Sequence, residues 1–264
     1  MTAAEKKPKS RPTLFDVYDP DAPVVTEVRR LLQNLARQAH ATERKVFLIT
    51  SAARGEGKST IAGLLSMVSA QVFRRRTLLI DADLRRPTIH DLMGLSQKPG
   101  LFEVLHHRSS TESAVRPTPI PSLSVLTSGS PTGAMGSAYD DDRFGRVLET
   151  LRPQYDMIFV DSAPAVPVIE PLLMAEHVDG ILLVAMAGKT PVTMVRRLKQ
   201  VLAPVADRVV GSILNNATEG LPYYYEYRYY GYERLRKGKL RRSKTPDAAA
   251  PPEGGDDKQT GGTS

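Results

Sequence analysis

The sequence predicts an α/β fold in which a mostly parallel sheet is covered by helices on both faces. Short apolar runs with the length of buried strands alternate along the chain with stretches of helical periodicity. Parallel strands need such helical crossovers, so a doubly wound sheet is the economical arrangement. The 264 residues contain 41% hydrophobic side chains, which is enough for one large domain with its own core.

Six apolar runs carry the strand prediction. The predicted strands are Val46–Ile49, Thr77–Ile80, Leu123–Leu126, Met157–Val160, Ile181–Val184 and Val209–Leu214. Helices are predicted from Glu27, after Thr26 as N-cap, from Lys58, over 143–151 and from Pro191. Residues 88–122 show no clear pattern beyond a short helix after Gly100.

The first predicted strand runs into a glycine-bearing loop and then a helix that opens with Lys58, which is typical of a phosphate-binding loop. Backbone N–H groups of such a loop and of the helix N-terminus point at one anion. The match is incomplete, because Ala52 stands where the strict pattern has glycine. The candidate nucleotide-binding residues are Ala53, Arg54, Gly55, Glu56, Gly57, Lys58, Ser59 and Thr60.

Carboxylates follow two further predicted strands. Asp81 and Asp83 come directly after one strand, and Asp161 ends another. Open α/β sheets bind ligands at the carboxyl ends of their strands. Paired acids at that edge are costly unless they share a cation. Asp161 has the Walker B position, from which it can hold Mg²⁺ through water.

Composition narrows the class of protein. The net charge of +7 suggests an anionic partner such as nucleotide, an acidic membrane surface or nucleic acid. Cysteine is absent, which removes disulfides and thiolate metal sites and fits a reducing compartment. No run approaches the ~18 apolar residues that span a bilayer. Residues 1–22 lack periodicity and are predicted to be a disordered arm, followed by a domain over 23–220.

The composition changes again after residue 220. Residues 221–240 form a tail rich in tyrosine and basic residues, and 241–264 are predicted to be disordered. No helical or strand period fits the tyrosines, so they cannot all lie in a core. An aromatic edge strand and a basic contact with membrane or nucleic acid remain open alternatives. The tyrosines of this cluster are Tyr223, Tyr224, Tyr225, Tyr227, Tyr229, Tyr230 and Tyr232.

Together these features resemble the cytoplasmic domain of bacterial tyrosine kinases (BY-kinases), the autokinases of capsule and exopolysaccharide export. The resemblance covers roughly Pro23 to Tyr232. The phosphate loop at Thr50–Thr60 and the D-x-D-x-R motif at Leu78–Arg85 match the family, a P-loop NTPase fold with deviant Walker motifs. The D-x-x-P motif within Ile158–Pro164 and the tyrosine cluster match as well.

The chain departs from the family in three places. Arg54 replaces the usual proline of the loop, Gln33 replaces the second arginine of the E-x-x-R-x-x-R contact helix, and the N-P-x-E-L run is missing. Glu27 and Arg30 retain the subunit-contact pattern. The nearest competitors, the partition and septum-site ATPases, carry a signature lysine where this chain has Ala53. Such an ATPase, or a nucleotide-binding regulator without phosphotransfer, is the alternative reading.

The resemblance implies ATP- and Mg²⁺-dependent protein-tyrosine autophosphorylation in trans, with the tail cluster as phosphoacceptor. Lys58 and the loop amides bind phosphate, and Ser59 ligates Mg²⁺ directly. Asp81 and Asp161 hold the water shell of the ion. Asp83 orients or deprotonates the attacking hydroxyl, although the roles of Asp81 and Asp83 can be exchanged.

The resemblance also implies partners and a location. A separate transmembrane polysaccharide co-polymerase activates the kinase and holds it at the inner face of the cell membrane, in the cytoplasm. A homo-oligomeric ring and a cognate tyrosine phosphatase are expected, and no specific nucleic acid is.

Overall fold

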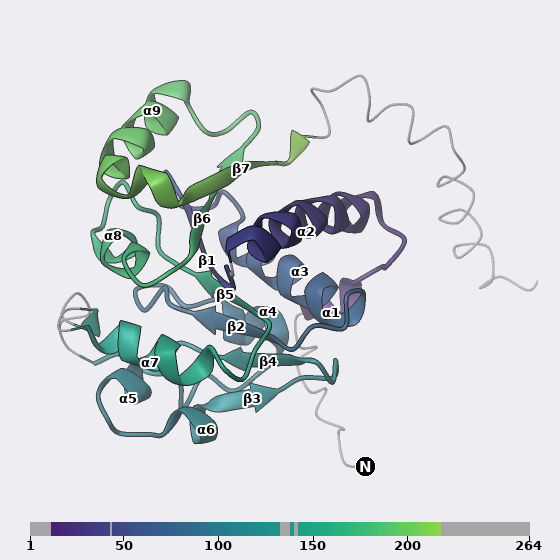
Figure 1. The fold of residues 1–264 in the computed structure, drawn as a ribbon, viewed down its shortest axis with the longest axis vertical. Coiled ribbons are helices and arrows are strands. Elements are labelled where there is room, and N and C mark those ends of the chain that lie inside the picture. The colour runs from purple at the N-terminus through teal and green to yellow at the C-terminus, as the bar shows by residue number, and fades with distance from the viewer. Residues whose placement is uncertain (1–11, 43, 133–137, 140–141, 218–264) are drawn as a thin grey trace, which may run out of the picture. The chain divides into compact units, whose positions relative to one another are not determined.

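A seven-stranded sheet forms the centre of the described structure, in the order β3-β4-β2-β5-β1-β6-β7 (Figure 1). The computed structural model describes residues 12–42, 44–132, 138–139 and 142–217. All strand pairs in it are parallel except β3 with β4. The strands are β1 (Val46–Ser51), β2 (Thr77–Asp81), β3 (Val115–Pro117), β4 (Leu123–Leu126), β5 (Met157–Asp161), β6 (Gly180–Met186) and β7 (Val209–Asn215).

The helices cover both faces of this sheet, as the alternating pattern predicts. One apolar core lies under α1 to α4, and the other lies under α5 to α9 (Figure 1). The helices on the first face are α1 (Leu14–Val17), α2 (Pro23–Thr42), α3 (Lys58–Gln71) and α4 (Ile89–Met93). Those on the second face are α5 (Leu101–Leu105), α6 (Thr111–Ala114), α7 (Arg143–Leu151), α8 (Glu170–Ala175) and α9 (Val192–Val201), with a 3₁₀ turn η2 (Ala203–Arg208). The predicted doubly wound, mostly parallel sheet is confirmed.

Helix α3 lies between the sheet and α2, and every residue from Ile61 to Ala70 is buried. Its polar side chains are satisfied internally. The Ser66 hydroxyl donates to the Ala62 carbonyl at 2.8 Å, and the hydroxyls of Ser69 and Thr77 are 2.9 Å apart. A helix enclosed in this way holds its own N-terminus, and with it the phosphate loop, in a fixed place.

The N-terminal region differs from the expected arm. Residues 12–22 are described, and they include α1, whose Leu14 is buried in the core. Helix α2 begins at Pro23 rather than after Thr26, because proline is favoured at the first helical position, where its missing N–H has no partner to lose. Residues 1–11 lie outside the described residues. Within the described part of the chain, no helix is both long and apolar enough to cross a membrane.

Candidate nucleotide site

The phosphate loop connects β1 to α3, as predicted. Gly55 and Gly57 have φ angles of +71° and +91°, which glycine adopts without strain. Lys58 is the first residue of α3 and is 7% exposed, and Ser59 next to it is half-buried. The free N–H groups of the first helical turn therefore adjoin a buried ammonium group, which is an arrangement suited to phosphate.

Ala53 has a different role from the expected phosphate contact. Its N–H donates to Glu56 Oε2 at 2.8 Å, and its carbonyl accepts from the Ser51 hydroxyl at 2.7 Å. The backbone of Ala53 is therefore engaged in bracing the loop from within, and its N–H is not free for an anion.

Asp161 lies beside Lys58 at the end of β5. Both of its carboxylate oxygens are buried, and neither has a hydrogen-bond partner among the described residues. Burial raises the pKa of Asp161 to about 7, although the nearby Ser59 hydroxyl and the charge of Lys58 oppose the shift. A buried carboxylate without partners is costly, so this group is suited to binding a cation.

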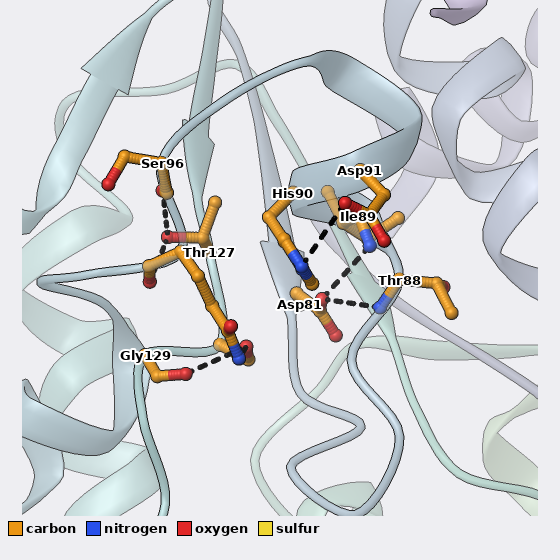
Figure 2. Close-up of polar contacts among 10 residues, drawn as sticks. Asp81, Thr88, Ile89, His90, Asp91, Ser96, Thr127 and Gly129 are labelled. Atoms are coloured by element: carbon orange, nitrogen blue, oxygen red, sulfur yellow. Dashed lines mark hydrogen bonds and ion pairs between the residues drawn. The ribbon is translucent and has the colours of Figure 1, made fainter. Parts of the chain in front are cut away.

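Asp81 is the neighbour of Asp161 across the parallel β2–β5 pair, where the two residues are in register. Its Oδ2 accepts the N–H groups of Thr88 and Ile89 at 3.2 and 3.1 Å (Figure 2). Its Oδ1 accepts the N–H of Asp83 at 3.3 Å. Burial raises the pKa of Asp81 well above its ordinary value, and the charge of Asp161 adds to this. Asp81 thus fastens the turn after β2 and the start of α4.

Asp83 is half-buried in that same turn. Burial raises its pKa, and the opposing influences include the N–H of Arg86, which donates to its Oδ1 at 3.0 Å, and the charges of Lys58 and Arg54. The structure therefore places Lys58, Asp81, Asp83 and Asp161 at one carboxyl edge of the sheet, as the sequence predicts.

The sequence predicts that a magnesium ion binds at this edge of the sheet. No three acidic or histidine side chains in the described part of the chain converge as a direct ligand set. The oxygens of Asp161, which have no hydrogen-bond partner among the described residues, and the adjoining Ser59 hydroxyl are the groups that fit an ion. Asp81, expected to hold the water shell of the ion, has both oxygens within reach of backbone donors instead.

The sequence did not predict two residues that lie near the turn with Asp81 and Asp83. The Tyr139 hydroxyl donates to the carbonyl of Ala82 at 2.7 Å, between the two acids of the turn. Glu170, at the start of α8, is 3% exposed, and its Oε1 accepts from Arg85 Nε at 2.7 Å. Its Oε2 is buried without a partner among the described residues. Both residues are distant from the turn in sequence, so no local pattern reveals them.

Hydrogen bonds also connect the segment after α4 with the segment after β4. The Thr127 hydroxyl donates to the carbonyl of Ser96 at 3.3 Å (Figure 2). The N–H of Gly129 donates to the carbonyl of Gln97 at 3.1 Å. These bonds join the segment after α4 to the carboxyl end of β4. The loop that follows β4 therefore starts from a fixed point beside the acids.

The remaining predicted site residues fall in two places. Glu27 and Arg30 form an intrahelical ion pair on α2, with Oε1 and Nη1 2.6 Å apart and both side chains largely exposed. The tyrosine cluster at 223–232 lies outside the described residues. The described tyrosines are not exposed, since Tyr139 is buried and Tyr18 and Tyr155 are half-buried.

Known structures share this fold. The septum site-determining protein MinD of Pyrococcus horikoshii, complexed with Mg-ADP, is 20% identical and superposes with a TM-score of 0.56 over 66% of this chain and 72% of that one. This likeness shows the fold alone. No family model matches the chain.

A curated relative decides the family. The tyrosine-protein kinase YwqD of Bacillus subtilis is 34% identical over 205 residues, which cover 78% of this chain and 85% of the relative. The chain belongs to the bacterial tyrosine-protein kinase family. The predicted kinase family and P-loop fold are confirmed.

Solved structures of bacterial tyrosine kinases agree with this assignment. The kinase domain of the Escherichia coli tyrosine kinase ETK is 28% identical, with a TM-score of 0.73, over 81% of this chain and 84% of that one. The putative tyrosine-protein kinase EpsB of Ralstonia solanacearum is 29% identical over 87% of this chain, which spans only 30% of EpsB. EpsB is therefore much longer than this chain.

Proposed function

We propose that the protein transfers the γ-phosphoryl group of ATP to tyrosines of its own C-terminal cluster, acting in trans, and that this regulates capsule or exopolysaccharide polymerisation and export. The observation that carries the proposal is the buried pair at the phosphate loop. A buried Lys58 lies at the start of α3, and the unpartnered carboxylate of Asp161 adjoins it. Kinase-family membership then supplies the class of reaction.

In this mechanism the loop amides and Lys58 bind the phosphates, and Ser59 and Asp161 hold Mg²⁺. The bound ion would supply charge neutralisation at the β- and γ-phosphates. The tyrosine oxygen attacks the γ-phosphorus as the bond to the β-bridging oxygen breaks, and ADP leaves. The phenolic proton passes to Asp83, whose raised pKa makes it a stronger base. We assign Asp81 to hold the turn that carries Asp83, because backbone N–H groups occupy both of its oxygens.

The described tyrosine Tyr139 is a poor phosphate acceptor on grounds of access. A tyrosine needs a free hydroxyl to be phosphorylated, and the Tyr139 hydroxyl is buried and already bonded. Burial also raises the pKa of Tyr139 well above its ordinary value, as do the charges of Asp81 and Asp83. We therefore assign the acceptor role to the cluster at 223–232.

Transfer in trans needs a neighbour, and we propose that Glu27 and Arg30 on α2 contribute to a homo-oligomeric ring. Each phosphate adds about −1.5 to −2 charge to a tail that is now basic. Accumulated phosphate would release the tail from the site lined by Asp81, Asp83 and Asp161, and would weaken the ring. We further propose that a separate transmembrane protein activates the kinase and brings it to the cytoplasmic face of the membrane, and that a phosphatase resets it.

The test is phosphotyrosine detection after incubation of the purified protein with Mg-ATP. Wild type and a Lys45→Ala control, altered at an exposed lysine before β1, gain phosphotyrosine, whereas Lys58→Ala does not. Replacing the seven tail tyrosines by Phe abolishes the signal and leaves ATP binding intact, whereas Tyr155→Phe does neither. The rate per molecule rises with protein concentration.

Two outcomes would contradict the proposal. Hydrolysis of ATP without any phosphotyrosine would favour the septum-site type of ATPase, and nucleotide binding without turnover would favour a regulator. Phosphate confined to tyrosines outside 223–232 would remove the tail from the mechanism.

A further inference from the structure

Side chains from two other strands hold the phosphate loop from its outer side. Lys189 follows β6, and its ammonium group donates to the carbonyl of Gly55 at 3.0 Å. Asn215 ends β7, and its amide Nδ2 donates to the carbonyl of Glu56 at 3.0 Å. Consecutive carbonyls of the loop are therefore fixed by residues more than a hundred positions away in sequence.

Glu56 is the third contact and the most buried, at 1% exposure. One oxygen accepts from the N–H of Ala53, and the other accepts from the Thr190 hydroxyl. That hydroxyl in turn accepts the N–H of Met186 at 2.9 Å. The carboxylate thus spans the loop and joins it to the turn after β6. Each polar group in this series of hydrogen bonds has a partner.

These contacts set the direction of two amide groups. In a trans peptide unit the N–H of one residue points opposite to the carbonyl of the residue before it. The carbonyls of Gly55 and Glu56 point to Lys189 and Asn215, so the N–H groups of Glu56 and Gly57 point away from them. No hydrogen bond within the described part of the chain uses either N–H. Both are left free for an anion.

The glycines of the loop allow this close approach. A Cβ on Gly55 would lie 2.8 Å from Lys189 Nζ, and one on Gly57 would lie 2.1 Å from Asn215 Nδ2. Either Cβ would displace the Lys189 or Asn215 side chain from its contact, and the positive φ angles add strain for any other residue. The outer contacts therefore account for both glycines in physical terms.

We propose that Glu56, Lys189, Thr190 and Asn215 form an outer clamp that aims the amides of Glu56 and Gly57 at the phosphates of the nucleotide. They act as positioning residues, because their side chains hold the binding loop, whereas the backbone amides of the loop contact the ligand. An anion site assembled in advance loses less free energy to ordering when it binds. The inference rests on the proposed nucleotide-binding function and specifies how that binding is achieved.

The test compares ADP and ATP affinity in single variants of the full chain. Lys189→Met and Asn215→Ala lower the affinity for both nucleotides by the same factor, about 10-fold, as supporting residues around a site typically do. In turnover the KM for ATP rises by a similar factor, and kcat changes much less. Thr190→Val has the same effect, and Thr190→Ser restores affinity because it retains the hydroxyl.

Controls separate positioning from folding and from direct contact. Lys199→Met removes an exposed lysine of α9 and leaves ADP affinity as in wild type. The melting temperature without nucleotide identifies any variant that fails to fold, and the nucleotide-induced rise in melting temperature is compared only among folded ones. Loss of ATP affinity with ADP affinity retained would overturn the proposal, since Lys189 would then contact the γ-phosphate directly. Wild-type affinity in folded Lys189→Met and Asn215→Ala would overturn it too, whereas absence of binding in wild type would refute the proposed function instead.

Discussion

Asp161 and Asp179 lie at opposite strand ends of the same sheet. Their carboxylate oxygens differ in the number of hydrogen-bond partners that they have. Asp161, at the carboxyl edge, is buried without a partner in the described structure, and burial raises its pKa to about 7. Asp179, just before β6, accepts the N–H groups of Lys45 and Val46 at 2.8 Å and two bonds from Arg152 at 2.9 and 2.8 Å. Burial raises the pKa of Asp179, but Arg152 and these N–H groups outweigh it and hold the pKa below its ordinary value.

The difference distinguishes a carboxylate that can bind a ligand from one that has a structural role. Asp179 ties β1 to β6 and α7, and its four bonds close within the protein. Asp161 has the same side chain and is more deeply buried, yet neither of its oxygens has a hydrogen-bond partner among the residues that the structure describes. Burial alone therefore does not distinguish the two roles, whereas the number of partners does.

The largest expected effect is on catalysis. Asp161→Asn removes the charge that we propose holds Mg²⁺, so autophosphorylation is expected to fall by about 1,000-fold. The loss of affinity is greater for Mg-ATP than for metal-free ATP. Asp179→Asn, judged per folded molecule, retains the activity of wild type. Kinetics and binding with and without EDTA measure both. Equal loss of Mg-bound and metal-free affinity in Asp161→Asn would remove the metal role.

The second prediction concerns stability without metal. The folded pKa of Asp161 lies above its unfolded value, so the folded state binds more protons between pH 4 and 7 and loses stability as pH rises through this window. In EDTA at pH 8, Asp161→Asn is therefore more stable than wild type, by at most ~4 kcal/mol. The gain disappears near pH 4. Urea unfolding at several pH values measures it, and a variant less stable than wild type at pH 8 would contradict the argument.

Asp179 has the reverse pH dependence and a smaller magnitude. Asp179→Ala leaves the N–H groups of Lys45 and Val46 and the Arg152 charge without their acceptor, and destabilises the protein by about 2–3 kcal/mol at pH 7. The folded pKa is lowered, so this contribution is present above pH 4 and is lost as pH falls through the folded pKa. The gap between wild type and variant narrows on acidification. A gap that widens there would show that the Arg152 pairing is not its source.

The smallest effect on stability is expected at Asp156, which forms an ion pair with Arg76. This pair lies at the same strand ends as Asp179 but is exposed to solvent. Their Oδ1 and Nη2 are 2.7 Å apart, and the side chains are 41% and 61% exposed. Exposed ion pairs contribute little to stability, so Asp156→Ala lowers the melting temperature by only about 1–2 °C. Raising the salt concentration reduces even this shift. A shift as large as that of Asp179→Ala would mean that burial does not control the strength of these pairs.

Much of the fold follows from local pattern. All six predicted strands are present, with ends that differ by at most two residues. The strand β3 was not predicted, because its three residues, Val115–Pro117, have no periodicity and pair only with β4. The short α1 was not predicted for a related reason: it depends on Leu14 packing into a core formed by later parts of the chain.

Some residues of the site could likewise be predicted from local sequence pattern, and others could not. Asp81, Asp83 and Asp161 could be predicted, because each stands at or just after a strand end, and parallel strands bring such ends together. Glu170, Lys189 and Asn215 could not, since their contacts join segments 85 to 159 positions apart. The altered role of Ala53 depends on where the Glu56 side chain turns, which no motif specifies.

Because α3 is buried from Ile61 to Ala70, its amide hydrogens reach solvent only when the layers around it open. Their exchange with deuterium therefore reports the free energy of global unfolding. The amides of Glu56 and Gly57 lie only a few residues before them but have no hydrogen-bond partner within the described chain, so they exchange readily until a phosphate covers them. One exchange experiment on this short segment thus measures the stability of the whole domain and the occupancy of its loop side by side.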